Sequence, residues 1–349
     1  MRWYAGENLP RTHARPTFSE SWFNHNYGFT FGERYSSDPI FRTEQDREAR
    51  RLLYERFGGL GLGSQNPQPY PHLDICGHRF ASVLLGCPIV YQEDQPPAVR
   101  RLRIDSAEEL PTIGKPDLDT HHWAREFLRQ GRLLLDRYGR LDATINFGGP
   151  LNVATSVVGT EFFTYLIDSP LLAQQFLNMV ADLCLECFDK LTLPLNPQLD
   201  PGRELFIGDC PVSMLSPKMY HDQILPADLR LRRKTRKLGL HHCGKMDGYL
   251  SSYRALQPLE YIEVGWGTTV AAVRQTFPTT IFDLMINVYD VSNMSASGMR
   301  DVIIDMARQG SPADLLRDVW VADIGPDVPD RVVVDFVEAV NAAFGTGST

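Results

Sequence analysis

The stretch from Lys237 to Asp247 reads Lys-Leu-Gly-Leu-His-His-Cys-Gly-Lys-Met-Asp, and the rest of the chain is best interpreted around it. Two leucines lead into the histidines and Gly244 breaks the run, which indicates a short buried strand ending in polar residues. Since successive side chains of a strand point to opposite faces, His241 and Cys243 share one face. An imidazole beside a thiol suits zinc, although both residue types also occur in ordinary cores.

The composition is that of a large globular protein. With 349 residues, 43% of them hydrophobic, the chain can form one large α/β barrel with an added segment, or two ordinary domains. A net charge of −8 argues against nucleic acid or an anionic membrane as the main partner. We find neither an apolar run of membrane-spanning length nor a signal-peptide core, so we expect a soluble, cytoplasmic protein, either a monomer or a homodimer.

The six cysteines are spread thinly along the chain and do not form the dense framework of a small disulfide-rich domain. We therefore expect them to be reduced. Cys184 and Cys187 form a Cys-x-x-Cys motif, but the surrounding sequence has the pattern of an amphipathic helix. Buried core thiols are the favoured interpretation of this motif.

Short apolar runs alternate with helical patterns from Pro71 onward. The predicted strands are 88–91, 142–147, 204–207, 238–242, 261–264, 281–288 and 319–324, and the predicted helices include 121–138, 161–168, 170–191, 217–238, 248–256, 295–309 and 331–344. This alternation is typical of parallel strands joined by helical crossovers. We predict a (β/α)8 TIM barrel over residues 71–349, with residues 1–70 as an aromatic and arginine-rich N-terminal extension covering one end.

Polar or small residues stand at the ends of most predicted strands, where active sites of such barrels gather. These strand ends carry Asn146, Asp209 with Cys210, His241 with Cys243, Glu263 with Trp266, Asn287 with Asp290, and Asp323. We predict a shared pocket there. Asp209, Glu263, Asn146 and Asn287 are the catalytic candidates, and Arg79, Trp266 and Tyr289 are the substrate-binding candidates. A surface salt bridge is the alternative role for Arg79.

Six stretches together resemble one known family. They are Asn146 to Gly159, Gly208 with Asp209, Leu215 to Tyr220, Leu240 to Gly244, Met285 to Val288, and Ile324 to Pro329. They resemble successive motifs of the uroporphyrinogen decarboxylase superfamily, and most closely its zinc-dependent branch of corrinoid and thiol methyltransferases. The resemblance covers roughly residues 70 to 345 and implies the barrel fold.

The resemblance also implies a metal site. In the methyltransferase branch a His-x-Cys pair and a later cysteine hold the metal. His241 and Cys243 match the pair, but Ala322 stands where the later cysteine is expected. Either a neighbouring strand end supplies the third ligand, or the metal is lost and His241 acts as an acid or base. Cys210, Glu263 and Asp323 are the replacement candidates, and Cys210 is favoured because a thiolate keeps the soft character of the pair.

The leading functional hypothesis is a metal-dependent alkyl (methyl) transferase. It would act on a small thiol or methylated substrate, with zinc or another divalent metal and with a corrinoid protein as a candidate partner. The alternative is a lyase that decarboxylates a small carboxylic acid in the same pocket with Asp209 and His241. A barrel that only binds its ligand is a third reading, kept open by Ala322. The sequence fits a porphyrinogen decarboxylase less well. The arginines Arg11, Arg15 and Arg34 match the arginine-rich N-terminal motif of those enzymes only loosely.

Overall fold

A computed structural model describes residues 13–196 and 204–345 of the chain. The strands are β1 (Ala14–Phe18), β2 (Ile89–Val90), β3 (Ala98–Val99), β4 (Glu204–Ile207), β5 (Lys237–His241), β6 (Tyr261–Val264), β7 (Ile281–Ile286) and β8 (Leu316–Ile324). The α-helices are α1 (Glu20–Tyr27), α2 (Glu33–Ser37), α3 (Pro39–Phe57), α4 (Phe80–Leu84), α5 (His122–Tyr138), α6 (Pro150–Val158), α7 (Glu161–Asp168), α8 (Pro170–Cys187), α9 (Leu193–Leu195), α10 (Pro217–Met219), α11 (Leu225–Arg232), α12 (Leu250–Tyr253), α13 (Val270–Thr276), α14 (Val288–Asn293), α15 (Ala296–Gln309) and α16 (Asp330–Phe344).

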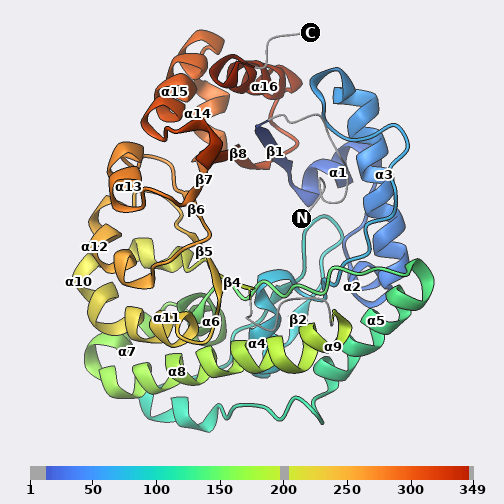
Figure 1. The fold of residues 1–349 in the computed structure, drawn as a ribbon. Coiled ribbons are helices and arrows are strands. Elements are labelled where there is room, and N and C mark those ends of the chain that lie inside the picture. The colour runs from blue at the N-terminus through green and yellow to red at the C-terminus, as the bar shows by residue number, and fades with distance from the viewer. Residues whose placement is uncertain (1–12, 197–203, 346–349) are drawn as a thin grey trace.

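Six parallel strands form the main sheet, in the order β1-β8-β7-β6-β5-β4. The strands lie on the inner side of a curved wall, and α10 to α13, α15 and α16 lie outside it (Figure 1). The predicted alternation of parallel strands and helices is confirmed for this sheet. Because parallel strands are covered on both faces, their sequences are nearly continuous apolar runs, as in β5 and β7.

The N-terminal segment enters the sheet, contrary to the prediction that residues 1–70 cover one end. β1 pairs in parallel with β8, with Ala14 opposite Val319 and Phe18 opposite Ile324. A boundary at residue 70 would therefore separate a strand from its sheet. Pro16 and the adjacent Arg15 made this strand hard to predict from the sequence, but proline is tolerated in a strand at the edge of a sheet.

Two other predicted strands differ from the structure. The run at 88–91 forms only β2, which pairs with β3 in a separate antiparallel ribbon. In the run at 142–147 a single parallel bridge joins Asp142 to His72. The side chains of Asp142 and Asn146 accept the N–H groups of Thr144 and Gly148, at 2.9 Å each, and so compete with strand pairing. Closure of an eight-stranded barrel stays a prediction.

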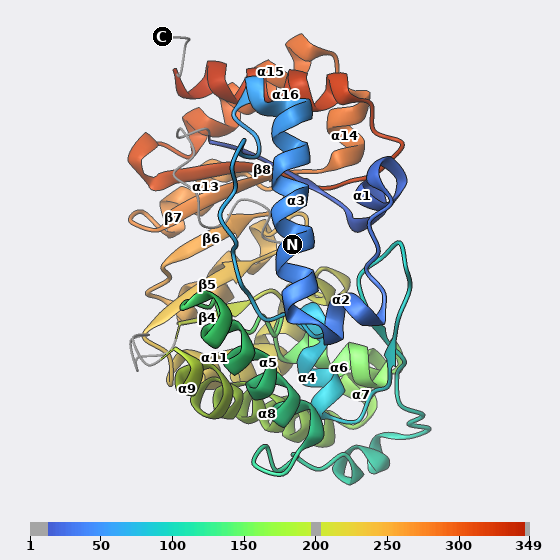
Figure 2. The same ribbon diagram turned by 90° about the vertical axis from the view of Figure 1, so that its right-hand side faces the viewer.

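Helix α3 is fixed to the segments before and after it by a buried arginine. Arg42 has no exposed surface and donates to the carbonyl oxygens of Tyr35 (2.8 Å), His72 (3.1 Å) and Asp74 (3.2 Å). These bonds satisfy carbonyls that would otherwise be buried without partners. The helix runs along one side of the molecule (Figure 2), and α12 and α13 lie on the opposite side (Figure 1).

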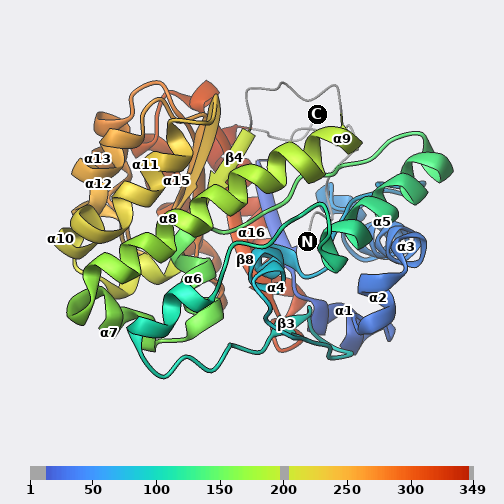
Figure 3. The ribbon, with the colours of Figure 1, turned by 90° about the horizontal axis from the view of Figure 1, so that it is seen from below.

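Helix α8 is the most apolar long helix, and it runs across the base of the molecule (Figure 3). Among the described residues, Pro170–Leu195 is one helical stretch with the length and composition of a membrane span, which the sequence prediction had not found. Of its most apolar window, 56% is buried inside the protein, where α8 packs against α6, α7 and α11. Cys184 and Cys187 are buried in this helix, as predicted.

Candidate metal centre

Cys210, His241 and Cys243 come together at the carboxyl ends of two neighbouring strands. β4 and β5 pair in parallel, with Ile207 opposite Leu240, so the residues that follow the two strands emerge at the same edge. His241 Nε2 lies 2.9 Å from Cys243 Sγ, and Cys243 Sγ lies 3.1 Å from Cys210 Sγ. Within the described ranges this is the one group of histidine, cysteine or acidic side chains whose ligand atoms, within 4.8 Å of one another, could hold a metal.

The donor set of this cluster fits zinc. One imidazole nitrogen and two sulfur atoms are ligands that zinc binds well, and three protein ligands are the usual number in catalytic zinc sites, which keep one position open. Both sulfur atoms belong to half-buried residues, so the cluster is not sealed behind hydrocarbon. The rings of Phe206 and Trp320 stand 6.1 Å and 6.0 Å from the His241 ring and form apolar walls beside it.

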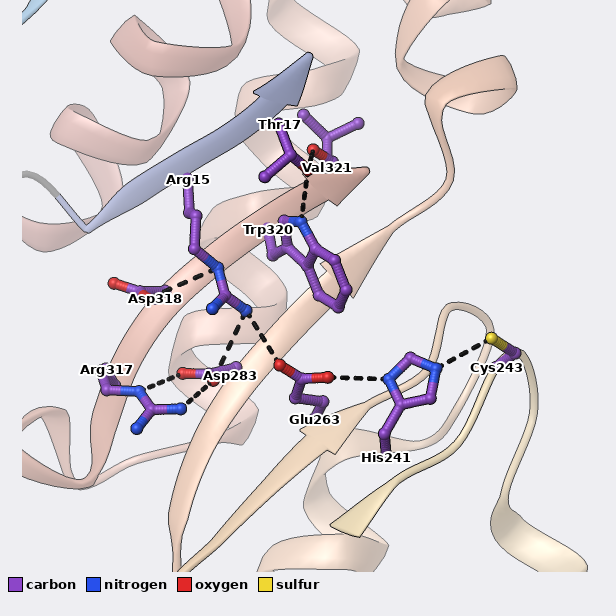
Figure 4. A network of polar contacts seen from close by, with 10 residues as sticks. All are labelled: Arg15, Thr17, His241, Cys243, Glu263, Asp283, Arg317, Asp318, Trp320 and Val321. Atoms are coloured by element: carbon purple, nitrogen blue, oxygen red, sulfur yellow. Dashed lines mark hydrogen bonds and ion pairs between the residues drawn. The ribbon is translucent and has the colours of Figure 1, made fainter. Parts of the chain in front are cut away.

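Glu263 holds the other side of the His241 ring. It lies opposite His241 on β6, and its Oε2 is 2.8 Å from His241 Nδ1 (Figure 4). Its Oε1 accepts a hydrogen bond from Arg15 at 3.2 Å. Burial raises the pKa of Glu263, but His241 and Arg15 outweigh it, so the pKa of this carboxyl is lowered and the group is ionised.

The cluster shares its protons. A hydrogen bond from Cys243 lowers the pKa of Cys210 to about 4, against the effect of burial, and the same bond raises the pKa of Cys243. Burial alone would lower the pKa of His241, but its contacts with Cys210 and Glu263 raise it to about 9. The cluster is therefore best described as a thiol and a thiolate sharing one proton next to an imidazolium. The shared thiol proton and the proton on His241 Nε2 would leave when a metal binds.

Asp209, predicted to be a pocket acid, binds the N-terminal end of helix α6. It is buried, and its Oδ1 accepts the backbone N–H of Asn152 at 2.8 Å, with the N–H of Leu151 as a second donor. Both groups belong to the first turn of α6, so Asp209 caps that helix from the end of β4. Burial raises the pKa of Asp209 to about 7, and burial together with the Asp209 charge also raises the pKa of Asp228. A catalytic role for Asp209 stays a prediction.

Replacing Gly149 by alanine is expected to lower the free energy of unfolding by about 1–3 kcal/mol, because the cap on α6 is lost. A methyl group at Gly149 would overlap the Asp209 carboxylate, whereas the φ of 167° is an extended conformation that alanine adopts freely. Urea denaturation measures the change. Gly59→Ala is the matched control, since a methyl group there meets nothing within 4 Å. Equal stabilities of the two variants would contradict the capping role.

Asn146 and Asn287, the other two catalytic candidates, have local structural roles and are exposed. Asn146 Oδ1 accepts the N–H of Gly148 at 2.9 Å. Asn287 is the N-cap of α14, where its Oδ1 accepts the N–H of Tyr289 at 2.7 Å. Such contacts are typical of asparagine at turns and caps, and a catalytic role for either residue stays a prediction.

The three predicted substrate-binding residues lie on different parts of the molecule. Arg79 is half-buried, with its Nη1 3.5 Å from the carbonyl oxygen of Pro97. Trp266 lines a groove of about 400 Å³ against α15, together with Met306. Tyr289 is 73% exposed on α14. The structure does not bring these three together as one binding surface.

Two contributors near the cluster were not predicted. Arg15, which the sequence associates only with an arginine-rich N-terminal motif, reaches Glu263 from β1. His78 lies near enough to Cys210 to lower the pKa of that thiol. If β1 had been predicted, it would have located Arg15, because β1 is the strand next to β8 in the sheet. Arg11 lies outside the described residues.

Comparisons with known proteins establish the fold. No family model matches the chain, and no curated protein matches it in sequence. Among solved structures, a methyltransferase from Methanosarcina mazei is similar over 98% of this chain and 94% of its own, with a TM-score of 0.61 and 16% identity. A B12-independent methionine synthase from Shewanella sp. W3-18-1 is 12% identical, covers 97% of both chains, and has a TM-score of 0.49, too low to support an argument.

The chain therefore has an α/β fold shared with a methyltransferase, which confirms at the level of the fold the resemblance seen in the sequence. The likeness spans almost the whole of both chains, so it includes β1 as well as the segments that carry the six motifs. At 16% identity the likeness defines the architecture, and the activity has to be argued from the site.

Proposed function

We propose that this protein is a metal-dependent alkyl (methyl) transferase acting on a small thiol or a methylated substrate. The observation that carries the proposal is the convergence of Cys210, His241 and Cys243 at the carboxyl edge of the sheet. The shared fold with a methyltransferase supports it. Zinc is the metal that the nitrogen and sulfur donors favour, although another divalent ion could bind the same set.

Cys210 is proposed as the third ligand. Ala322, at the place where the resemblance implies a cysteine, lies on β8 two residues after Trp320 and therefore on the same face of the strand. That face looks toward His241, since the Trp320 and His241 rings are 6.0 Å apart. The thiol missing from β8 is thus matched by a thiol at the end of β4, 3.1 Å from Cys243.

The remaining residues of the site act on the ligands and the substrate. A bound zinc ion would lower the pKa of a substrate thiol and stabilise its thiolate at neutral pH. Glu263 holds His241 in place, while Phe206 and Trp320 limit the access of water to the ring. A corrinoid protein is the proposed methyl-donating partner, and this part of the proposal rests on the resemblance in sequence.

Methyl transfer between defined compounds tests the proposal. Zinc-loaded protein is incubated with 2-mercaptoethanol and either methylcobalamin or a methylated amine, sulfide or ether, and the methylated thiol is measured by mass spectrometry. We expect turnover with at least one donor, its loss with a chelator, and its return with zinc. Failure with every donor, combined with carbon dioxide release from a small carboxylic acid without any methyl acceptor, would instead establish the lyase alternative.

A further inference from the structure

Arg15 is the centre of a charged network on the inner face of the sheet (Figure 4). It extends from β1 and approaches acidic side chains on three other strands. Its Nη2 donates to Glu263 Oε1 at 3.2 Å and lies 3.5 Å from Asp283 Oδ2, and its Nε lies 3.6 Å from Asp318 Oδ2. One guanidinium therefore links β1 to β6, β7 and β8.

The guanidinium of Arg15 is itself held in place. Its central carbon lies 4.6 Å from the centre of the Trp320 ring, within the range of a cation–π contact. Trp320, on β8, in turn donates from its Nε1 to Thr17 Oγ1 on β1 at 2.7 Å, and this bond holds the ring in place. Asp283 is fully buried and is also bound by Arg317 at 2.9 Å. With both its stacking partner and its acids anchored, Arg15 has a defined orientation.

This orientation determines what Glu263 can do. Arg15 occupies Oε1 of the carboxylate, and His241 Nδ1 occupies Oε2 at 2.8 Å. An ionised carboxylate only accepts hydrogen bonds, so Nδ1 must carry a proton. When the ring gives up its other proton to bind a metal, the lone pair is therefore on Nε2, the atom that lies 2.9 Å from Cys243 Sγ.

We infer that Arg15 is a positioning residue for the metal centre, acting through Glu263 to fix the His241 tautomer that presents Nε2 to a metal. The inference rests on the proposed function, since it takes the ligand to be a metal ion. It gives the N-terminal strand a functional reason to be in the sheet, because no residue of β4 to β8 replaces Arg15 at Glu263 Oε1 among the contacts of the described residues.

The test measures zinc affinity and the His241 tautomer in Arg15→Met and Arg15→Lys. Zinc affinity is measured by competition with a chromophoric chelator. The tautomer is measured by ¹⁵N NMR of histidine-labelled, metal-free protein, assigned with His241→Gln, at a pH well above the His241 pKa of about 9, where the ring is neutral. We expect Arg15→Met to weaken zinc binding by roughly 10–100-fold and to give a mixture of tautomers. Arg15→Lys keeps the charge without the planar fork and should give a smaller loss.

Arg230→Met is the matched control, because it also removes an arginine bound to an acid, Asp182, but takes no part in the contacts of Arg15 or Glu263. It should bind zinc within about threefold of the original protein. Arg15 variants that fold, bind zinc as tightly as the original and keep the Nδ1–H tautomer would overturn the inference; if Arg15→Met does not fold, Arg15→Lys decides. If the original protein fails to bind zinc, the proposed function falls, and the tautomer in metal-free protein still decides whether Arg15 positions His241.

Discussion

Replacing Cys243 by serine is expected to remove the bound metal and, with it, the activity of the protein. Cys243 is the central member of the cluster, since its sulfur lies 2.9 Å from His241 Nε2 and 3.1 Å from Cys210 Sγ. A serine hydroxyl does not ionise near neutral pH and is a poor partner for a soft site. Metal content should fall from about one ion per chain to below about a tenth.

Turnover of the Cys243→Ser variant should fall by roughly a thousandfold, since metal stabilisation of a reacting group amounts to several kcal/mol. Elemental analysis and the methyl-transfer assay measure the two effects. Cys184→Ser is the control, because it also removes a thiol but lies within α8 and is not one of the three cluster residues. A Cys243→Ser protein that is folded, retains one metal ion per chain and turns over normally would remove this cysteine from the site.

Exchanging the cysteine at position 210 with the alanine at position 322 should move the third metal ligand from the end of β4 to β8. Cys210→Ala is expected to weaken zinc binding by roughly 100-fold or more, because two protein ligands remain of three. Adding Ala322→Cys to that variant should recover at least about tenfold. Position 322 lies on the face of β8 that looks toward His241. A thiol there would approach the cluster from β8, whereas Cys210 approaches it from the end of β4.

Chelator competition measures the affinities of both variants. The control is Ala322→Ser in the Cys210→Ala protein, which adds a side chain of similar size without a thiol and should recover nothing. Unchanged zinc binding in Cys210→Ala would show that Cys210 is not a ligand. Recovery by serine as well as by cysteine would show that position 322 acts through packing and not through coordination.

The sequence predicted the parts of the fold that depend on local pattern. The apolar runs that became β4 to β8 are bounded by clear breakers. His241 and Cys243 were expected on one face of a strand; β5 ends at His241, but the two side chains do meet, at 2.9 Å. Strand β1 was not predicted, because Pro16 and Arg15 have a low preference for central strands. Only its pairing with β8, about three hundred residues away, stabilises it in the sheet. No local signal carries such a long-range contact.

The candidate site was predictable to a similar extent. Parallel pairing of β4 with β5 brings Cys210 beside Cys243, which strand order alone could suggest. The cap that Asp209 provides to α6 could not be foreseen, because it joins residues more than fifty positions apart. Likewise, the link from Arg15 to Glu263 depends on the neighbouring positions of β1 and β8, which pairing across the sheet determines.

The most direct test of the central claim is X-ray absorption spectroscopy at the zinc edge of the metal-loaded protein. If Cys210, His241 and Cys243 hold the ion, the first shell contains two sulfur atoms at about 2.3 Å and an imidazole nitrogen at about 2.0–2.1 Å. The Cys210→Ala protein should then show one sulfur fewer. A first shell of oxygen and nitrogen without sulfur in the original protein would contradict the account.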